Sequence, residues 1–197
     1  MTPDEEVVAR QIGRRPRGLL RVESRCAWGY PVAVSVAPLV DERRGRGPRE
    51  PFPTTFWLTC PILVEQASRM EAAGLVGRLE EEAAADPAFA GRLAADHARY
   101  AAERASLLDA DARAEAGRRG LLPVLDRSGV GGVRDLRSVK CLHAHLAHHR
   151  ARGGNAVAGE MEARHGLREC TEAEVRCRGF GEAPPGADPT MPEGGAP

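Results

Sequence analysis

Hydrophobic positions alternate with small or polar ones in the first third of the chain and recur at helical spacing after it. Valine stands at every second position from 32 to 36, which is the period of a β-strand. We predict strands over residues 18–24, 31–37 and 54–59 from this alternation and from their β-branched and aromatic content. The connector between the first two is short enough for a hairpin. A short helix over residues 5–12 is predicted to precede them.

The remaining pattern is helical, and prolines and glycines set its limits. Pro61 and Pro87 stand where the first residue of a helix is expected, and Gly153 follows a helical stretch at the usual C-terminal position. Between the predicted helices, a charged Gly/Pro-rich loop and a glycine-rich turn interrupt the pattern. We predict helices over residues 61–73, 75–85, 86–116, 135–152 and 156–165, with the loop at 41–53 and the turn at 127–133.

The order of these elements indicates an α+β fold. The strands cluster at the start of the chain and do not alternate with helices, which argues against a parallel doubly wound sheet. We therefore predict a small, three-stranded, mainly antiparallel sheet from the N-terminal third, covered by about five helices. Residues 1–177 are predicted to form a single domain. The Pro/Gly-rich residues 178–197 cannot pack a core and are predicted to be a disordered tail.

Composition narrows the class of protein. The chain has 28 basic and 28 acidic residues, and a net charge of zero argues against a general nucleic-acid binder. Neither a signal peptide nor an apolar run of the roughly 18 residues that cross a bilayer is apparent. We therefore expect a cytoplasmic protein without a membrane span. Five cysteines, an odd number in that setting, favour free thiols, metal ligation or redox chemistry over a disulfide framework.

The predicted helix over residues 135–152 contains a cysteine and several histidines. At about 100° per residue, Cys141, His145 and His148 share one side of it, whereas His143 lies across the helix. The Cβ atoms of Cys141 and His145 would be roughly 6 Å apart, so both side chains could reach one metal ion. This helix face is a candidate metal site.

Two further cysteines belong to the N-terminal elements. Cys26 lies at the mouth of the predicted hairpin, and Cys60 precedes Pro61 as the predicted N-cap of a helix. The helix dipole and free N–H groups at that position are expected to lower the pKa of the Cys60 thiol. We predict a site for zinc or an iron–sulfur cluster assembled from Cys26, Cys60 and Cys141, with a fourth ligand from His145 or His148, or alternatively from Cys170. Its predicted ligands are Cys26, Cys60, Cys141, His145 and His148.

Three segments resemble a bacterial family catalogued as domain of unknown function 501, which is common among actinobacteria. They are residues 11–18, residues 51–61 with Leu-Thr-Cys-Pro, and residues 139–148 with Val-Lys-Cys-Leu-His. The family pattern includes Cys26, Cys60, Cys141, His143 and His148. It also has a second cysteine where this chain has Trp28, which cannot bind a metal. The resemblance implies no activity.

Three hypotheses for function remain open, and they do not agree on whether the protein is an enzyme. The first is a metal-binding or cluster-binding protein. The second is an enzyme in which Cys60 or Cys141 is the nucleophile and His143 or His148 the general base. The third is a non-catalytic protein that docks on an unidentified partner through its long alanine-rich helix. The resemblance links this third hypothesis to cell division or envelope growth.

Overall fold

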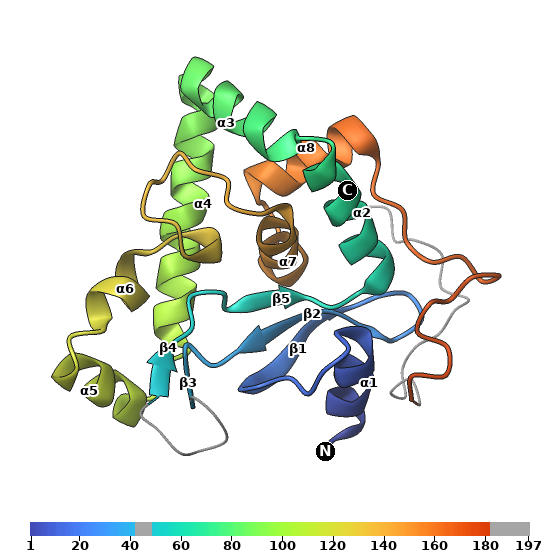
Figure 1. Cartoon of the computed structure of the whole chain (residues 1–197), viewed down its shortest axis with the longest axis horizontal. Helices are drawn as coiled ribbons and strands as arrows, with labels where there is room; N and C mark the ends of the chain where they lie inside the picture. The colour runs from blue at the N-terminus through green and yellow to red at the C-terminus, as the bar shows by residue number, and fades with distance from the viewer. Residues whose placement is uncertain (42–48, 182–197) are drawn as a thin grey trace, which may run out of the picture.

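The structure, a computed structural model, describes residues 1–41 and 49–181. Three strands form an antiparallel sheet in the order β1-β2-β5 (Figure 1). Their bounds are β1 Leu19–Arg25, β2 Pro31–Val36 and β5 Phe56–Leu58. The predicted α+β class and the three-stranded sheet of the N-terminal third are therefore confirmed.

The central strand β2 is buried at every position. Successive side chains of a strand point to opposite faces, so both faces of the sheet are covered along β2. Helix α7 (Leu142–Arg152) contacts all three strands, and helix α1 (Pro3–Gln11) also contacts β2. The alternating valines of β2 thus belong to a core strand.

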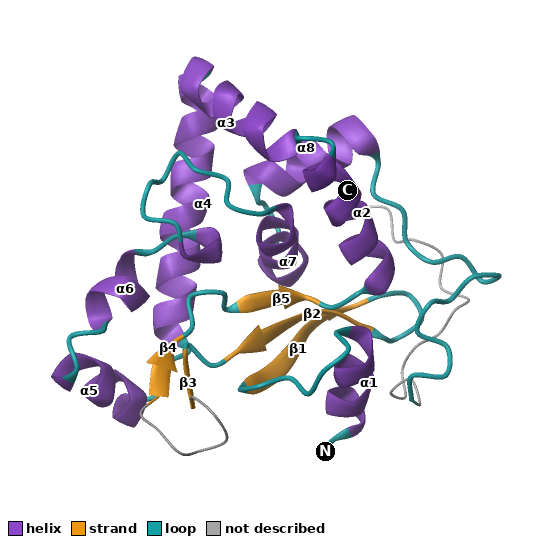
Figure 2. Ribbon diagram, viewed as in Figure 1, coloured by secondary structure: helices purple, strands orange, loops and turns teal. Residues whose placement is uncertain are grey.

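Helices make up most of the remaining chain (Figure 2). The described residues contain eight α-helices, where about five covering helices were expected, and one short 3-10 helix at Val130–Gly132. The largest group of buried hydrophobic residues joins β5 and helices α2, α3, α4, α7 and α8 in one core. The α-helices not yet given bounds are α2 Pro61–Ala72, α3 Leu75–Ala85, α4 Pro87–Ser106, α5 Ala110–Arg118, α6 Leu122–Arg127 and α8 Ala156–His165.

The predicted helix over residues 86–116 is wrong in one respect, because the helix ends at Ser106 and a second one begins at Ala110. Asp109 starts a new helix there, and its carboxylate accepts a hydrogen bond from the backbone N–H of Ala112. An aspartate in this role favours a helix start over a helix interior. The long helix is therefore two helices, α4 and α5.

The predicted loop at 41–53 is wrong in part, because Asp41 and residues 49–51 belong to a short antiparallel hairpin, β3 (Leu39–Asp41) with β4 (Arg49–Pro51). Residues 42–48 lie outside the described residues. Two ion pairs attach β4 to α5: Arg49 contacts Glu115 at 2.5 Å, and Arg119 contacts Glu50 at 3.0 Å. The partners are more than sixty residues apart in the chain. The local sequence pattern could not reveal this hairpin, because the contacts that hold it come from a distant part of the chain.

The histidine-containing helix begins at Leu142, seven residues later than predicted. Two glutamates from other helices capture the chain just before it. Glu80 accepts the N–H of Val139 at 2.8 Å, and Glu71 accepts the N–H of Leu142 at 2.6 Å. Cys141 is therefore the extended N-cap residue of α7, with φ −157° and ψ 142°, and does not lie on a helix face.

After α8 the chain continues in turns to residue 181 and packs back on α1. Cys177 is buried in a cluster with Val7 and Tyr30, and Phe180 packs against this cluster. The remainder of the predicted tail, residues 182–197, lies outside the described residues. None of the helices in residues 1–41 and 49–181 is both long and apolar enough to cross a membrane.

Candidate functional site

Three potential metal ligands meet where α2 ends and α7 begins. Glu71, Cys141 and His143 each place a ligand atom within 4.8 Å of the other two. Glu71 comes from the last turn of α2, and the other two come from the N-terminus of α7. The N–H of Leu142 holds the Glu71 carboxylate over this helix end, where the helix dipole favours a negative charge.

The imidazole of His143 faces an acceptor at each ring nitrogen. Its Nδ1 lies 3.0 Å from Glu71 Oε1, and its Nε2 lies 3.2 Å from the carbonyl oxygen of Val64. A neutral imidazole carries only one N–H, so it can donate to only one of these two acceptors. The hydroxyl of Ser68 also lies 3.1 Å from Nε2 and can donate to it. A proton on Nδ1 therefore satisfies both nitrogens, whereas a proton on Nε2 leaves Nδ1 free to bind a cation.

Cys141 contributes a half-buried sulfur to this group. Burial is the largest influence on its thiol and raises its pKa, while the N–H of Ala144, 3.4 Å from Sγ, acts in the opposite direction. The free thiol is therefore mostly protonated near neutral pH and a weak nucleophile. A bound metal ion would reverse this balance, because a coordinated thiol loses its proton.

A cavity of about 480 Å³ adjoins the group, and Cys141 and His143 are among the residues that line it. Its lining also includes Arg14 and three aromatic residues, Phe52, Phe56 and Trp57. The guanidinium of Arg14 lies 5.0 Å from the ring centre of Trp57, and Phe52 packs edge-on against Trp57 at 5.6 Å. The cavity thus combines one permanent positive charge with flat apolar surfaces.

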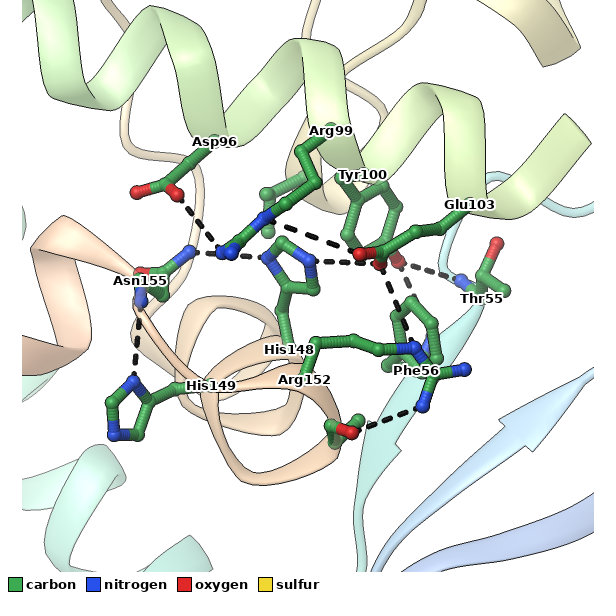
Figure 3. A network of polar contacts seen from close by, with 12 residues as sticks. Thr55, Phe56, Asp96, Arg99, Tyr100, Glu103, His148, His149, Arg152 and Asn155 are labelled. Atoms are coloured by element: carbon green, nitrogen blue, oxygen red, sulfur yellow. Dashed lines mark hydrogen bonds and ion pairs between the residues drawn. The ribbon is translucent and has the colours of Figure 1, made fainter.

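His148 is fully buried and is not among the residues that line this cavity. Figure 3 shows it between α4 and the start of α8. Its ring stacks on Phe56 at 5.7 Å and meets the edge of Tyr100 at 5.1 Å. Its Nε2 is 2.9 Å from Glu103 of α4, and its Nδ1 is 3.3 Å from the side-chain amide of Asn155, the N-cap of α8. These contacts connect α4, α7 and α8 through one side chain, so His148 has a structural role here.

His145 is also fully buried, and its Nδ1 lies 3.2 Å from Asn155 Oδ1. Its Nε2 has no hydrogen-bond partner in the described part of the chain. Burial, reinforced by the neighbouring His97 and His148, lowers the pKa of His145 to about 3. The ring is therefore neutral in the folded protein at any physiological pH.

This burial predicts loss of stability in acid. Below pH 6.5, the ordinary value for histidine, the unfolded state binds a proton at residue 145 that the folded state excludes until about pH 3. The free energy of unfolding should therefore fall by about 1.4 kcal/mol per pH unit across that window from this group alone. NMR of protein with labelled histidine rings at pH 5 should show a neutral His145. If all six histidine rings gain a proton near pH 6.5, the lowered pKa of His145 is wrong.

Cys60 is the N-cap of α2, as predicted, but the predicted effect on its thiol is wrong. Burial raises the pKa of Cys60 to about 11 and outweighs the N–H groups of Ile62 and Leu63, which lower it. Burial also raises the pKa of Cys26. Desolvation thus dominates the helix dipole at this N-terminus.

The five predicted ligands do not come together at ligand spacing. Among residues 1–41 and 49–181, only Glu71, Cys141 and His143 form a group of three or more potential ligands within 4.8 Å of one another. Cys141 is the only predicted ligand in it, and the set of five stays a prediction. The sequence pattern placed His143 across the helix from Cys141, because the helix was predicted to begin at residue 135 and not at Leu142. Glu71 carries no local signal, since it lies 72 residues from His143.

Comparison with known proteins gives one match. A family model described as "Protein of unknown function (DUF501)" matches residues 22–163, which is more than half of the chain. No curated protein matches the chain, and neither does any solved structure.

Proposed function

Because the chain belongs to the DUF501 family, for which no function is given, we propose a function from its geometry: it binds zinc through Glu71, Cys141 and His143. The ion would keep a fourth position open toward the adjoining cavity. The observation that carries this proposal is the meeting of one sulfur, one nitrogen and one oxygen donor within 4.8 Å. Zinc sites with three protein ligands and one open position are typical of catalysis.

The donor set favours zinc over an iron–sulfur cluster. Zinc accepts thiolate, imidazole and carboxylate together at about 2.0 to 2.3 Å, whereas iron–sulfur clusters need several cysteine thiolates. Only one of the three donors is a cysteine. An iron–sulfur cluster is therefore a poor fit to this group.

The surroundings of His143 also support metal binding. With zinc on Nδ1, the Nε2–H would donate to the carbonyl of Val64, 3.2 Å away. Metal-bound histidines usually donate their second N–H to such an acceptor, which fixes the ring orientation. A cation on Nδ1 would also attract the Glu71 carboxylate, whose Oε1 lies 3.0 Å from that nitrogen.

The cavity favours a small anionic ligand with a flat apolar part. Arg14 would bind its charged group, and Trp57 and Phe52 would contact its apolar part. A zinc ion supplies a water molecule with a pKa near 7, which is the chemistry of hydrolysis. We therefore propose hydrolysis of a small anionic compound as the activity.

A thiol-dependent enzyme is the second candidate, because Cys141 and His143 lie in one group beside the cavity. The raised pKa of Cys141 weighs against it. Ser68 Oγ is also 3.1 Å from His143 Nε2, but Ser68 is exposed and is not part of the cavity lining. A serine nucleophile at that position would not face the bound ligand.

Glu71→Gln provides the test of zinc binding, with Glu80→Gln as its matched control. Both glutamates accept a backbone N–H near the start of α7, from Val139 and Leu142, but only Glu71 belongs to the donor group. We expect Glu71→Gln to weaken zinc binding at this site by at least about tenfold, measured by titration against a zinc indicator, and Glu80→Gln to leave it unchanged. Equal affinity in the wild type and Glu71→Gln would overturn the proposal.

A further inference from the structure

Four cysteines outside the proposed zinc site gather at one end of the sheet. Cys26 follows β1, Cys60 caps α2, and Cys170 and Cys177 lie in the turns after α8. All four are free thiols. Three separate parts of the chain therefore bring four soft metal ligands to one region.

Packing contacts place these segments against one another. Cys26 packs against the core cluster that contains Cys60 and also against the cluster that contains Cys177. The indole Nε1 of Trp28 donates to the carbonyl oxygen of Cys170 at 3.4 Å. Residues 170–177 are thus held over the hairpin between β1 and β2.

The thiols are also close enough to influence one another electrostatically. Beyond the larger effect of burial, Cys170 and Cys177 raise the pKa of Cys60, and Cys170 raises that of Cys26. Cys26 and Cys170 in turn raise the pKa of Cys177. These mutual effects agree with the packing contacts that place the four cysteines in one region.

We propose that Cys26, Cys60, Cys170 and Cys177 bind a second zinc ion, as a structural site with four thiolates. Structural zinc sites are closed, with four protein ligands and Zn–S distances of about 2.3 Å. Zinc would displace four protons from the four thiols and would fasten residues 167–181 to the hairpin and to α2. This site is independent of Glu71, Cys141 and His143.

Closing this site requires the C-terminal segment to rearrange. The four sulfurs are not at ligand spacing, since no three of them lie within 4.8 Å of one another in the described chain. Among described residues 166–181, one isolated bridge, Thr171 with Glu174, is the only β pairing, and no helix is formed. Such a segment can rearrange at low cost, and metal binding commonly completes the folding of its own ligands.

One hydrogen bond already resembles the surroundings of a bound thiolate. The side-chain amide of Gln11 donates to Cys177 Sγ at 3.2 Å and also to the carbonyl oxygen of Pro31 at 2.8 Å. Outer donors of this kind orient the ligands of a metal site.

The DUF501 match ends at residue 163, so Cys170 and Cys177 lie beyond the matched range while Cys26 and Cys60 lie within it.

Cobalt(II) and zinc binding to the full chain tests this second site. With both sites loaded we expect about two zinc ions per wild-type chain and about one in Cys177→Ser or Cys141→Ser. The thiolate-to-cobalt charge-transfer band should fall steeply in Cys177→Ser and only slightly in Cys141→Ser, because the sites hold four thiolates and one. Zinc should also slow proteolysis after residue 166 in the wild type and in Cys141→Ser, but not in Cys177→Ser.

The outcomes separate the two zinc sites. Equal metal content and equal charge-transfer bands in the wild type and Cys177→Ser would overturn the four-cysteine site and leave the Glu71 site untouched. Iron with sulfide in place of zinc, or a mass lower by two hydrogens from a disulfide, would also overturn it. If Cys177→Ser fails to fold by circular dichroism, Cys170→Ser gives the same comparison from the more exposed cysteine.

Discussion

Replacing Arg104 by methionine is expected to lower the free energy of unfolding by at least about 3 kcal/mol. Arg104 is fully buried on α4, and its guanidinium donates to three carbonyl oxygens. These belong to Leu125 at 2.6 Å, Ser128 at 2.5 Å and Pro53 at 3.2 Å. Methionine has similar bulk but no donor, so three acceptors would lose their partner, and each buried unsatisfied group costs about 1–3 kcal/mol.

Arg113→Met is the matched control for this prediction. Arg113 lies on α5, is largely exposed, and reaches Asp126 only at 3.5 Å. Exposed ion pairs contribute little, so we expect a change below about 1 kcal/mol. Urea denaturation of both variants measures the difference. Similar losses in the two variants would show that the buried guanidinium contacts contribute no more than a surface ion pair.

The second large effect is expected from Gly129→Ala, at about 3 kcal/mol of lost stability. A Cβ at this position would lie 2.4 Å from Nδ1 of His97 and 2.8 Å from its Cβ. His97 cannot move aside easily, because Nδ1 accepts the N–H of Val130 at 3.0 Å and Nε2 lies 3.1 Å from the carbonyl of Ser138. The backbone at Gly129, with φ −77°, suits any residue, so lack of space causes the loss.

Gly91→Ala should change stability in the opposite direction. Gly91 lies inside α4, and nothing lies within 4 Å of a Cβ built there. Alanine is about 1 kcal/mol more favourable than glycine in a helix interior. The midpoint of urea denaturation should therefore rise for Gly91→Ala and fall for Gly129→Ala. Equal shifts would contradict the steric explanation.

Elements that depend on neighbouring residues were predictable from sequence. The valine alternation indicated β2, and the helix at Leu75–Ala85 has the predicted bounds. Cys60 is an N-cap because Pro61 follows it. The failures occur where a distant group decides the outcome, as when Glu80 and Glu71 capture the chain before α7 and delay the start of that helix.

The candidate site shows the same division. Cys141 and His143 share one short peptide whose chemistry was visible, but Glu71 joins them only through the packing of α2 against α7. Whether the pKa of Cys60 is raised or lowered also depends on burial, which the local sequence does not reveal. The N-cap position favours a thiolate, yet burial by the folded chain outweighs it. Burial is a property of the whole fold.

The central claim is a zinc ion held by Glu71, Cys141 and His143. Anomalous diffraction at the zinc edge, from crystals grown with zinc and without a histidine tag, tests it most directly. We expect an anomalous peak about 2.0 to 2.3 Å from a Glu71 carboxylate oxygen, Cys141 Sγ and His143 Nδ1. Ordered density for these three side chains with no anomalous peak between them, at saturating zinc, would contradict it.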